Sequence, residues 1–180
     1  MLNSTSPLAI APIYKQLQYS SVNSETFSIL EYNCMVEYWF NSYHMLRYTH
    51  QIEKLKKTMP TLVCLCEVSP LFFEMLLAQD FIQQTYAVLA DPFIVKAVQS
   101  KNNEGCEFGN VILSRLPFNQ CHYLYWHNMS SRPALIASVT LQNQLQLIIT
   151  CVHFKAGYDY ANSNMRREQI IQLFETLDSH

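Results

Sequence analysis

The stretch Leu62-Val-Cys-Leu-Cys-Glu67-Val-Ser-Pro70 decides the fold of this chain. It begins within the compact, largely apolar run 61–65, whose length and lack of charge predict a buried strand. Ser69-Pro70 predicts the start of a helix, because proline is tolerated in the first helical turn. The strongly apolar segment 71–78 would form the body of that helix. Glu67 is therefore predicted to lie where a buried strand passes into a helix.

Around this stretch the chain alternates between strand and helix patterns. That order predicts a layered α/β or α+β domain with a central sheet. Residues 1–25 lack clear periodicity and are predicted to be a loosely ordered lead-in to a domain over 26–180. The expected strands are 27–32, 86–90, 111–113, 134–141 and 145–152, the expected further helices are 46–59 and 164–177, and 91–108 is expected to be a loop.

Two local patterns in the second half of the chain refine this picture. Gln142-Asn143-Gln144 predicts a hairpin turn in which Asn143 takes a positive φ. The last helix is predicted to gather its apolar residues on one face, which no later strand covers. We therefore expect poor solubility or association of the isolated chain, because an uncovered apolar face favours both. The residues of that face are Ile170, Ile171, Phe174 and Leu177.

Composition and charge exclude several classes of protein. The chain has 180 residues, 49% of them hydrophobic, and a net charge of −2, which indicates one folded domain and excludes disorder. Its 12 basic residues are scattered and oppose 14 acidic ones, so it does not bind nucleic acid by charge alone. A phosphate-bearing substrate would need a metal ion or a few well-placed cations. No apolar run reaches the ~18 residues of a membrane span, and no secretory signal is expected.

The six cysteines are predicted to be reduced and mostly in the core. Most of them lie in apolar runs, where a thiol packs as a small hydrophobe, which fits a cytoplasmic compartment. Zinc binding by Cys64-x-Cys66 is the alternative, and it is disfavoured because a second Cys-x-x-Cys or His pair is absent. The cysteines are Cys34, Cys64, Cys66, Cys106, Cys121 and Cys151.

Three polar residues end predicted strands, namely Asn33, Glu67 and His153. Polar groups just past strand ends lie at the rim of a sheet, where they can line a site. Glu67 is a candidate ligand for Mg²⁺, which prefers carboxylate oxygens; the alternative is an exposed glutamate at a turn. His153 is a candidate for stabilising charge in a transition state, and the alternative is a structural histidine. Spacing alone does not decide between these interpretations.

The order of five segments adds a further argument. Together they resemble successive blocks of the endonuclease/exonuclease/phosphatase superfamily over about residues 26–178. Within it, the tyrosyl-DNA phosphodiesterase 2-like branch is most similar, on the basis of Tyr38-Trp39-Phe40, Arg47 and Glu67-Val-Ser-Pro70. The segments are Phe27-Ser-Ile-Leu-Glu-Tyr-Asn33, Leu62-Val-Cys-Leu-Cys-Glu67-Val68, Gly109-Asn-Val-Ile-Leu-Ser-Arg-Leu-Pro-Phe118, Ile149-Thr-Cys-Val-His153-Phe-Lys and Arg167-Glu-Gln169-Ile-Ile-Gln-Leu.

The resemblance implies an α+β fold, a four-layer α/β/β/α sandwich, and divalent-metal-dependent hydrolysis of phosphoester bonds. It implies that Glu67 binds Mg²⁺ or Mn²⁺, that Asn33 orients the metal-bound or phosphate oxygens, and that His153 contacts the scissile phosphate. The metal would neutralise charge that develops on oxygen as an activated water attacks phosphorus. Nucleic-acid ends are a candidate substrate. Arg132, which precedes a predicted strand, is a candidate substrate-binding residue, with a solvated surface residue as the alternative.

The chain also departs from the family pattern. Cys66 replaces the usual Gln, and His153-Phe-Lys-Ala156 replaces the branch's His-Leu-Glu-Ser. The family's later Gly-Asp-x-Asn and Asp-His motifs have no counterpart, and Asp178-Ser-His180 lies at the end of a predicted helix. We therefore expect a chain truncated at its C-terminus, with an incomplete sheet. The alternatives to an enzyme are an inactive remnant and a non-catalytic metal- or phosphate-binding module.

Overall fold

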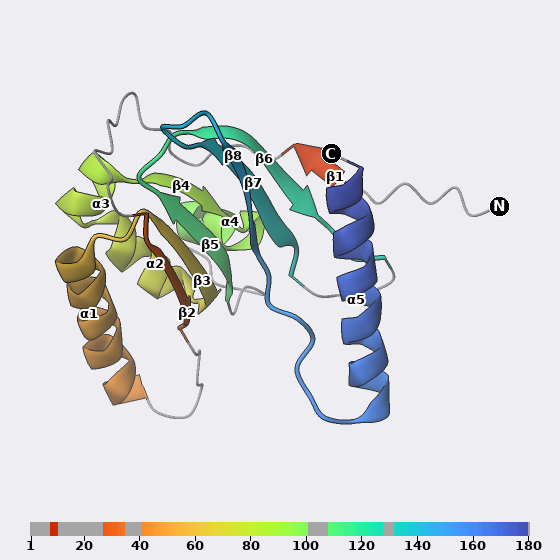
Figure 1. Ribbon diagram of the computed structural model, residues 1–180. Coiled ribbons are helices and arrows are strands. Elements are labelled where there is room, and N and C mark those ends of the chain that lie inside the picture. The colour runs from red at the N-terminus through yellow and green to blue at the C-terminus, as the bar shows by residue number, and fades with distance from the viewer. Residues whose placement is uncertain (1–7, 11–26, 35–40, 101–107, 128–131, 180) are drawn as a thin grey trace.

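A computed structural model describes residues 8–10, 27–34, 41–100, 108–127 and 132–179. Tyr38–Phe40 and Cys106 lie outside these residues. The elements along the chain are β1 (Leu8–Ile10), β2 (Ile29–Asn33), α1 (Asn41–Thr58), β3 (Leu62–Val68), α2 (Pro70–Leu77), α3 (Asp80–Thr85), β4 (Ala87–Ala90), α4 (Pro92–Ser100), β5 (Gly109–Ser114), β6 (Phe118–Leu124), β7 (Ala134–Thr140), β8 (Gln146–Cys151) and α5 (Tyr160–Asp178) (Figure 1).

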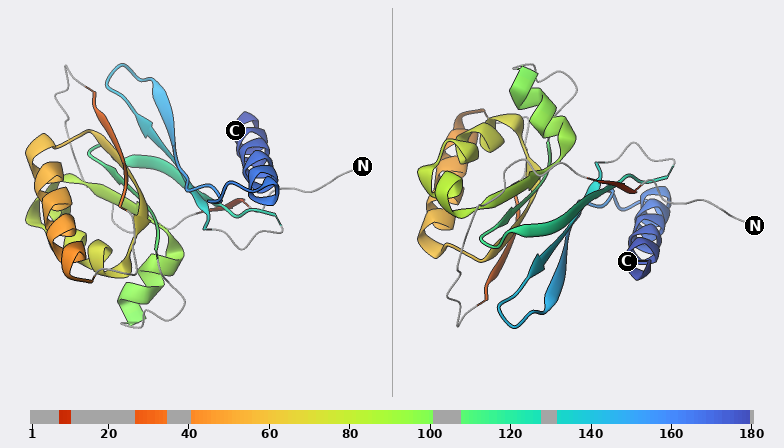
Figure 2. Two further views of the ribbon diagram at one scale, coloured as in Figure 1. Left: turned by 90° about the horizontal axis from the view of Figure 1, so that it is seen from below. Right: turned by 90° about the horizontal axis from the view of Figure 1, so that it is seen from above.

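These elements form four layers. Sheet I has the strand order β2-β3-β5-β4, with β2 and β3 parallel and the other pairs antiparallel. Sheet II has the order β1-β6-β7-β8 and is antiparallel throughout. Figure 2 shows helices α1 to α4 outside sheet I and α5 outside sheet II, with the two sheets between them. The α/β/β/α sandwich predicted from the sequence is confirmed.

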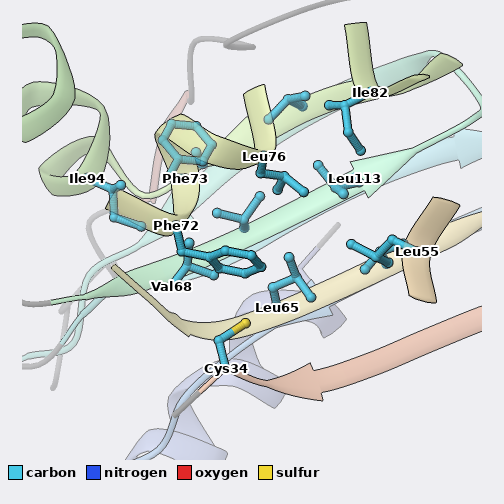
Figure 3. Packing of buried hydrophobic residues seen from close by; sticks show 14 of the residues in the cluster. Cys34, Leu55, Leu65, Val68, Phe72, Phe73, Leu76, Ile82, Ile94 and Leu113 are labelled. Atoms are coloured by element: carbon cyan, nitrogen blue, oxygen red, sulfur yellow. The ribbon is translucent and has the colours of Figure 1, made fainter. Parts of the chain in front are cut away.

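The buried strand β3 supplies side chains to two separate cores. Alternate residues point to opposite faces of a sheet, so Val63 and Leu65 pack against the helices while Cys64 and Cys66 pack between the sheets. Figure 3 shows the helix-side core, where Phe72 of α2 lies over Leu65. Because both faces of β3 are covered, its sequence is almost entirely apolar.

Helix α2 begins as the sequence predicts. The Ser69 hydroxyl accepts a hydrogen bond from the backbone N–H of Phe72 at 3.1 Å, and Pro70 occupies the first turn, where a missing N–H leaves nothing unpaired. The Tyr48 hydroxyl of α1 lies 3.0 Å from the same serine oxygen, which ties the two helices together. The junction after β3 is therefore fixed from two sides.

The loop predicted over 91–108 is wrong for residues 92–100, which form α4, while residues 101–107 lie outside the described residues. The Asp91 carboxylate accepts a hydrogen bond from the backbone N–H of Phe93 at 2.8 Å, and Pro92 is the first helical residue. Asp-Pro is thus a helix start here, not a break. Helix α3 and strand β6 were not predicted, and the first helix begins at Asn41 instead of the predicted residue 46.

Residues 142–144 form the predicted turn, but the residue with positive φ is not the predicted one. Gln144 has a φ of 66°. The Asn143 side chain instead accepts a hydrogen bond from the backbone N–H of Leu145 at 3.1 Å. The asparagine therefore stabilises the turn through its side-chain oxygen, while the residue after it takes the left-handed conformation.

Helix α5 also buries a different face from the predicted one. Ile170, Ile171 and Phe174 are exposed, whereas Leu173 packs into the core formed by β6 and β7. Leu177 is the one residue of the predicted face that packs against this core. Gln169 is buried because its side-chain oxygen accepts a hydrogen bond from the backbone N–H of Lys155 at 3.0 Å. A buried glutamine with a satisfied hydrogen bond thus lies on the packed face of α5, where only apolar residues were predicted.

Part of the expected lead-in over 1–25 is paired in a sheet. Leu8–Ile10 form β1, which pairs antiparallel with β6. These three residues are therefore not loosely ordered, which corrects the prediction for them. The rest of the lead-in lies outside the described residues, and the boundary at residue 26 stays a prediction.

The described cysteines agree with the prediction of buried, reduced thiols. Cys34, Cys64, Cys66, Cys121 and Cys151 are all free and buried. Among the described residues, no three or more His, Cys, Asp or Glu side chains are grouped as a metal ion would require. In the same part of the chain, no helix has both the length and the apolar character that crossing a membrane requires.

The packing of α2 predicts a contrast between two leucines. Leu76 is fully buried, whereas Leu71 on the same helix is 46% exposed. Leu76→Ala should lower the free energy of unfolding by about 2–5 kcal/mol, because it leaves a cavity in the helix-side core. Leu71→Ala should change it by no more than about 0.5 kcal/mol. Urea denaturation of both variants measures the difference, and equal losses would contradict this packing.

Candidate active site

An irregularity in β3 positions the first candidate residue. Leu65 pairs with Val111 of β5 and Val68 pairs with Gly109, so β3 has one residue more than its partner between these pairs. Glu67 lies in this bulge with a φ of 54°, a left-handed conformation that costs a non-glycine residue about 1–2 kcal/mol. Such strain is most often found at functional positions.

The bulge determines where the Glu67 carboxylate points. In an uninterrupted strand, residue 67 would share the helix-side face with Val63 and Leu65, among buried apolar side chains. The extra residue gives that face to Val68, which is fully buried in the helix-side core. Burying an unpaired carboxylate there would be strongly unfavourable. The bulge thus turns Glu67 out to the rim of the sheets.

The three residues predicted from strand ends meet at this rim. The Asn33 amide donates a hydrogen bond to Glu67 Oε1 at 3.0 Å. His153 Nε2 lies 3.4 Å from the same oxygen, with the two side chains 24% and 19% exposed, respectively. Asn33 comes from the end of β2, Glu67 from β3 and His153 from the segment after β8. Parallel pairing of β2 with β3 places the first two side by side.

Arg132 lies beside this group without contacting it directly. Its guanidinium is 4.9 Å from the ring centroid of Phe93 and 5.8 Å from that of Phe108, and the Phe108 ring is 5.8 Å from the His153 ring. The Trp126 indole N–H donates to the Arg132 carbonyl at 2.7 Å, which fixes the backbone. Arg132 and His153 are therefore linked through one aromatic ring. No pattern in the sequence singled out the two phenylalanines.

Asp91 is a buried carboxyl near Arg132 that the sequence analysis did not select. One of its oxygens, Oδ2, is buried without a hydrogen-bond partner, as is the side-chain oxygen of the neighbouring Asn110. Burial raises the pKa of Asp91 from its ordinary value to about 6, while the backbone N–H of Phe93 and the charge of Arg132 oppose the increase. Nothing in the sequence indicated that this carboxyl is buried.

The residues at the rim suit a hard divalent cation. Mg²⁺ is bound in proteins through one or two carboxylates and keeps several waters. Glu67 offers one carboxylate, and the hydrogen bond from Asn33 fixes its orientation, as supporting residues do around metal ligands. The strained backbone at Glu67 holds this carboxylate at the rim instead of in the core. Glu67 therefore offers one oxygen ligand of the kind that Mg²⁺ prefers, while no group of three or more His, Cys, Asp or Glu side chains among the described residues could hold a metal ion.

Comparison with known proteins identifies the fold. No protein-family model matches the chain, and no curated protein matches it. Solved structures of TDP2 do match: a D. rerio TDP2 humanized by 14 mutations, at 18% identity over 84% of this chain and 56% of that chain, has a TM-score of 0.61. The chain has the fold of TDP2.

Two further TDP2 structures agree with this assignment. D. rerio TDP2 complexed with a single-strand DNA product matches at 19% identity over 84% of this chain and 53% of its own, with a TM-score of 0.61. C. elegans TDP2 matches at 14% identity over 85% and 42%, also with a TM-score of 0.61. The chain thus spans about half the length of the TDP2 structures. The resemblance predicted from the sequence is confirmed at the level of the fold.

The left-handed backbone at Glu67 predicts that glycine gives a more stable protein than alanine at this position, the reverse of the usual order within a strand. Glu67→Gly and Glu67→Ala both remove the carboxylate, but only glycine adopts a φ near 54° without strain. The glycine variant should be more stable than the alanine variant by about 1 kcal/mol. Thermal or urea unfolding of the two variants checks this. A more stable alanine variant, the usual result within a strand, would contradict the bulge.

The raised pKa of Asp91 predicts a pH dependence of stability. The folded protein binds this proton more tightly than the unfolded chain, so the stability from Asp91 is greatest at acid pH and is lost as the pH rises through about 6. Asp91→Asn removes this loss. Relative to that variant, the wild type should lose up to ~3 kcal/mol of stability between pH 4 and pH 7, at about 1.4 kcal/mol per pH unit. Denaturation of both proteins at pH 4 and pH 7 measures this loss. If the stability difference between wild type and Asp91→Asn is the same at both pH values, the burial of the Asp91 carboxylate is contradicted.

Proposed function

We propose that this chain carries a divalent-metal-dependent phosphoesterase site that acts on nucleic-acid ends. The observation that carries the proposal is the convergence of Asn33, Glu67 and His153 at one rim, with Glu67 Oε1 within 3.0 Å and 3.4 Å of the other two side chains. Asn33 and Glu67 come from neighbouring strands and His153 from the segment after β8, so all three reach one oxygen, Glu67 Oε1, from separate parts of the chain. The TDP2 fold supports the same reaction class.

Each residue has a role that its chemistry supports. Glu67 would hold Mg²⁺ or Mn²⁺, and Asn33 would hold the carboxylate in position by donating to Oε1. His153 would donate a hydrogen bond to a phosphoryl oxygen and stabilise the charge that develops there. When bound, the metal would supply a Lewis acid for the phosphoryl group and an activated water.

Arg132 would provide the substrate contact. A guanidinium binds phosphate oxygens in a forked geometry, and an exposed aromatic ring stacks on a nucleobase. Arg132 lies over Phe93, which is exposed, so both kinds of contact are available at one place. The scattered basic residues favour a short contact at a strand end over a long duplex footprint. The complex of D. rerio TDP2 with a single-strand DNA product supports this choice of substrate.

A non-catalytic metal- or phosphate-binding module is the second candidate. Among the described residues, His, Cys, Asp and Glu form no group of three or more that could hold a metal ion. A site with a single carboxylate ligand would bind the metal weakly. Such a module would use the same three residues but would leave a phosphodiester intact.

Calorimetric titration with Mg²⁺ and Mn²⁺, paired with a hydrolysis assay on a short single-stranded DNA, separates these functions. Wild type should bind metal, Glu67→Gln should abolish binding, and Asn33→Ala should weaken it about 10–100-fold. Glu74→Gln, an exposed glutamate on α2, is the control and should bind normally. Metal-dependent cleavage that is lost with Glu67→Gln supports the enzyme, whereas binding without cleavage supports the module. Binding that survives Glu67→Gln, or cleavage that survives excess EDTA, would refute the site.

A further inference from the structure

Two cysteines from opposite sheets meet directly beneath the candidate active site. Cys66 of β3 and Cys151 of β8 have their sulfur atoms 3.9 Å apart. Cys66 precedes Glu67 in the chain, and Cys151 lies two residues before His153. The pair therefore sits on the same two segments that bring the carboxylate and the imidazole together.

Each thiol also contacts the backbone of the opposite segment. Cys66 Sγ donates to the Val152 carbonyl at 3.5 Å, and Cys151 Sγ donates to the Leu65 carbonyl at 3.5 Å. Strands β3 and β8 come close enough for their Cα atoms to lie within 8 Å of each other. Disulfide-bonded cysteines have Cα atoms about 4.4–6.8 Å apart, so the two strands must lie at that separation for the bond to form.

From this geometry we propose that Cys66 and Cys151 are a site of oxidative modification, at which a peroxide-class oxidant forms a disulfide between the two sheets. The sulfur atoms must close from 3.9 Å to a bond of about 2.05 Å, which requires movement of the two side chains and of the strands that carry them. Cys66 retains 8% of its surface exposed, whereas Cys151 is 2% exposed. Cys66 is therefore the cysteine that meets the oxidant, and Cys151 is its resolving partner.

The chemistry balances with one molecule of hydrogen peroxide. The Cys66 sulfur attacks one peroxide oxygen and the O–O bond breaks, which gives a sulfenic acid at Cys66 while the other oxygen leaves as water with the thiol proton. The Cys151 sulfur then attacks the Cys66 sulfur. The S–O bond breaks, and the hydroxyl leaves as a second water with the Cys151 proton. Two thiols are oxidised and the peroxide is reduced to two waters.

The other cysteines define the competing pairing and the control. Cys64 also hydrogen-bonds to Cys151 and is the one competing partner among the described residues. Cys34 lies on the opposite face of sheet I, in the helix-side core beside Leu65 (Figure 3). Cys121 belongs to the same core between the sheets as Cys66 and Cys151. It is the matched control, because it shares their surroundings.

The disulfide would act on the candidate active site through the bulge. Closing the bond draws the backbone at Cys66 toward β8, and the next residue is Glu67 in its strained left-handed conformation. This consequence, unlike the modification itself, rests on the proposed function. We expect the oxidised protein to bind Mn²⁺ several-fold more weakly than the reduced protein, and dithiothreitol to restore binding.

The test treats the full chain with hydrogen peroxide under native conditions, blocks remaining thiols with N-ethylmaleimide and maps peptides by mass spectrometry without reduction. A Cys66–Cys151 cross-link that lacks two hydrogens and disappears on reduction is the expected result. Cys66→Ser and Cys151→Ala should each abolish it, while Cys121→Ser should form it at the wild-type rate. Unchanged circular dichroism after treatment shows that the fold persists.

Other outcomes overturn the proposal. A cross-link of Cys64 to Cys151, or sulfinic acid at Cys66 without a cross-link, would refute the pairing, and so would full alkylation of both cysteines after peroxide treatment. The wild-type peptide map gives this answer even if a variant fails to fold. Calorimetry with Mn²⁺ is read separately. If the cross-link forms but the reduced protein binds no Mn²⁺, the proposed function fails while the modification site stands.

Discussion

The structure depends on one constraint at β3. This strand is buried on both faces, and yet its Glu67 carboxylate must lie at the surface. A strand with two covered faces has no position for a charged side chain. The bulge between Leu65 and Val68 resolves this conflict by adding one residue, so that Val68 fills the helix-side core and Glu67 lies outside both cores. The left-handed backbone at Glu67 is the local cost of that solution. The apolar character of β3, the start of α2 and the position of the candidate site all follow from it.

Small side chains between the sheets allow the second part of the site to form. Face-to-face sheets usually pack about 10 Å apart, with their side chains filling the space. At the end of β3 the facing residues are cysteines, and the thiols of Cys66 and Cys151 contact the opposing backbone directly. A leucine at either position would separate β3 from β8. The short distance between His153 and Glu67 therefore depends on the small size of the residues beneath them.

The sequence predicted elements whose signals are local, and it predicted the candidate residues through their places at strand ends. Apolar runs and Ser69-Pro70 were sufficient for β3 and α2. The loop predicted over 91–108 was wrong for residues 92–100, because Pro92 after Asp91 begins a helix. The bulge at Glu67 and the face that α5 buries could not be predicted. Both depend on partners distant in sequence, namely Gly109 of β5 for the bulge and Lys155 for Gln169.

The topology explains why three residues so far apart in sequence meet. Parallel pairing brings the ends of β2 and β3 to the same edge, so Asn33 and Glu67 become neighbours as soon as sheet I forms. His153 arrives from sheet II and reaches them only when the two sheets stack. The hydrogen bond between Asn33 and Glu67 thus requires only sheet I, whereas the contact between His153 and Glu67 requires that the two sheets be stacked. Any change that shifts the stacking of the sheets should act first on His153, and the Cys66–Cys151 contact lies where such a shift would be transmitted.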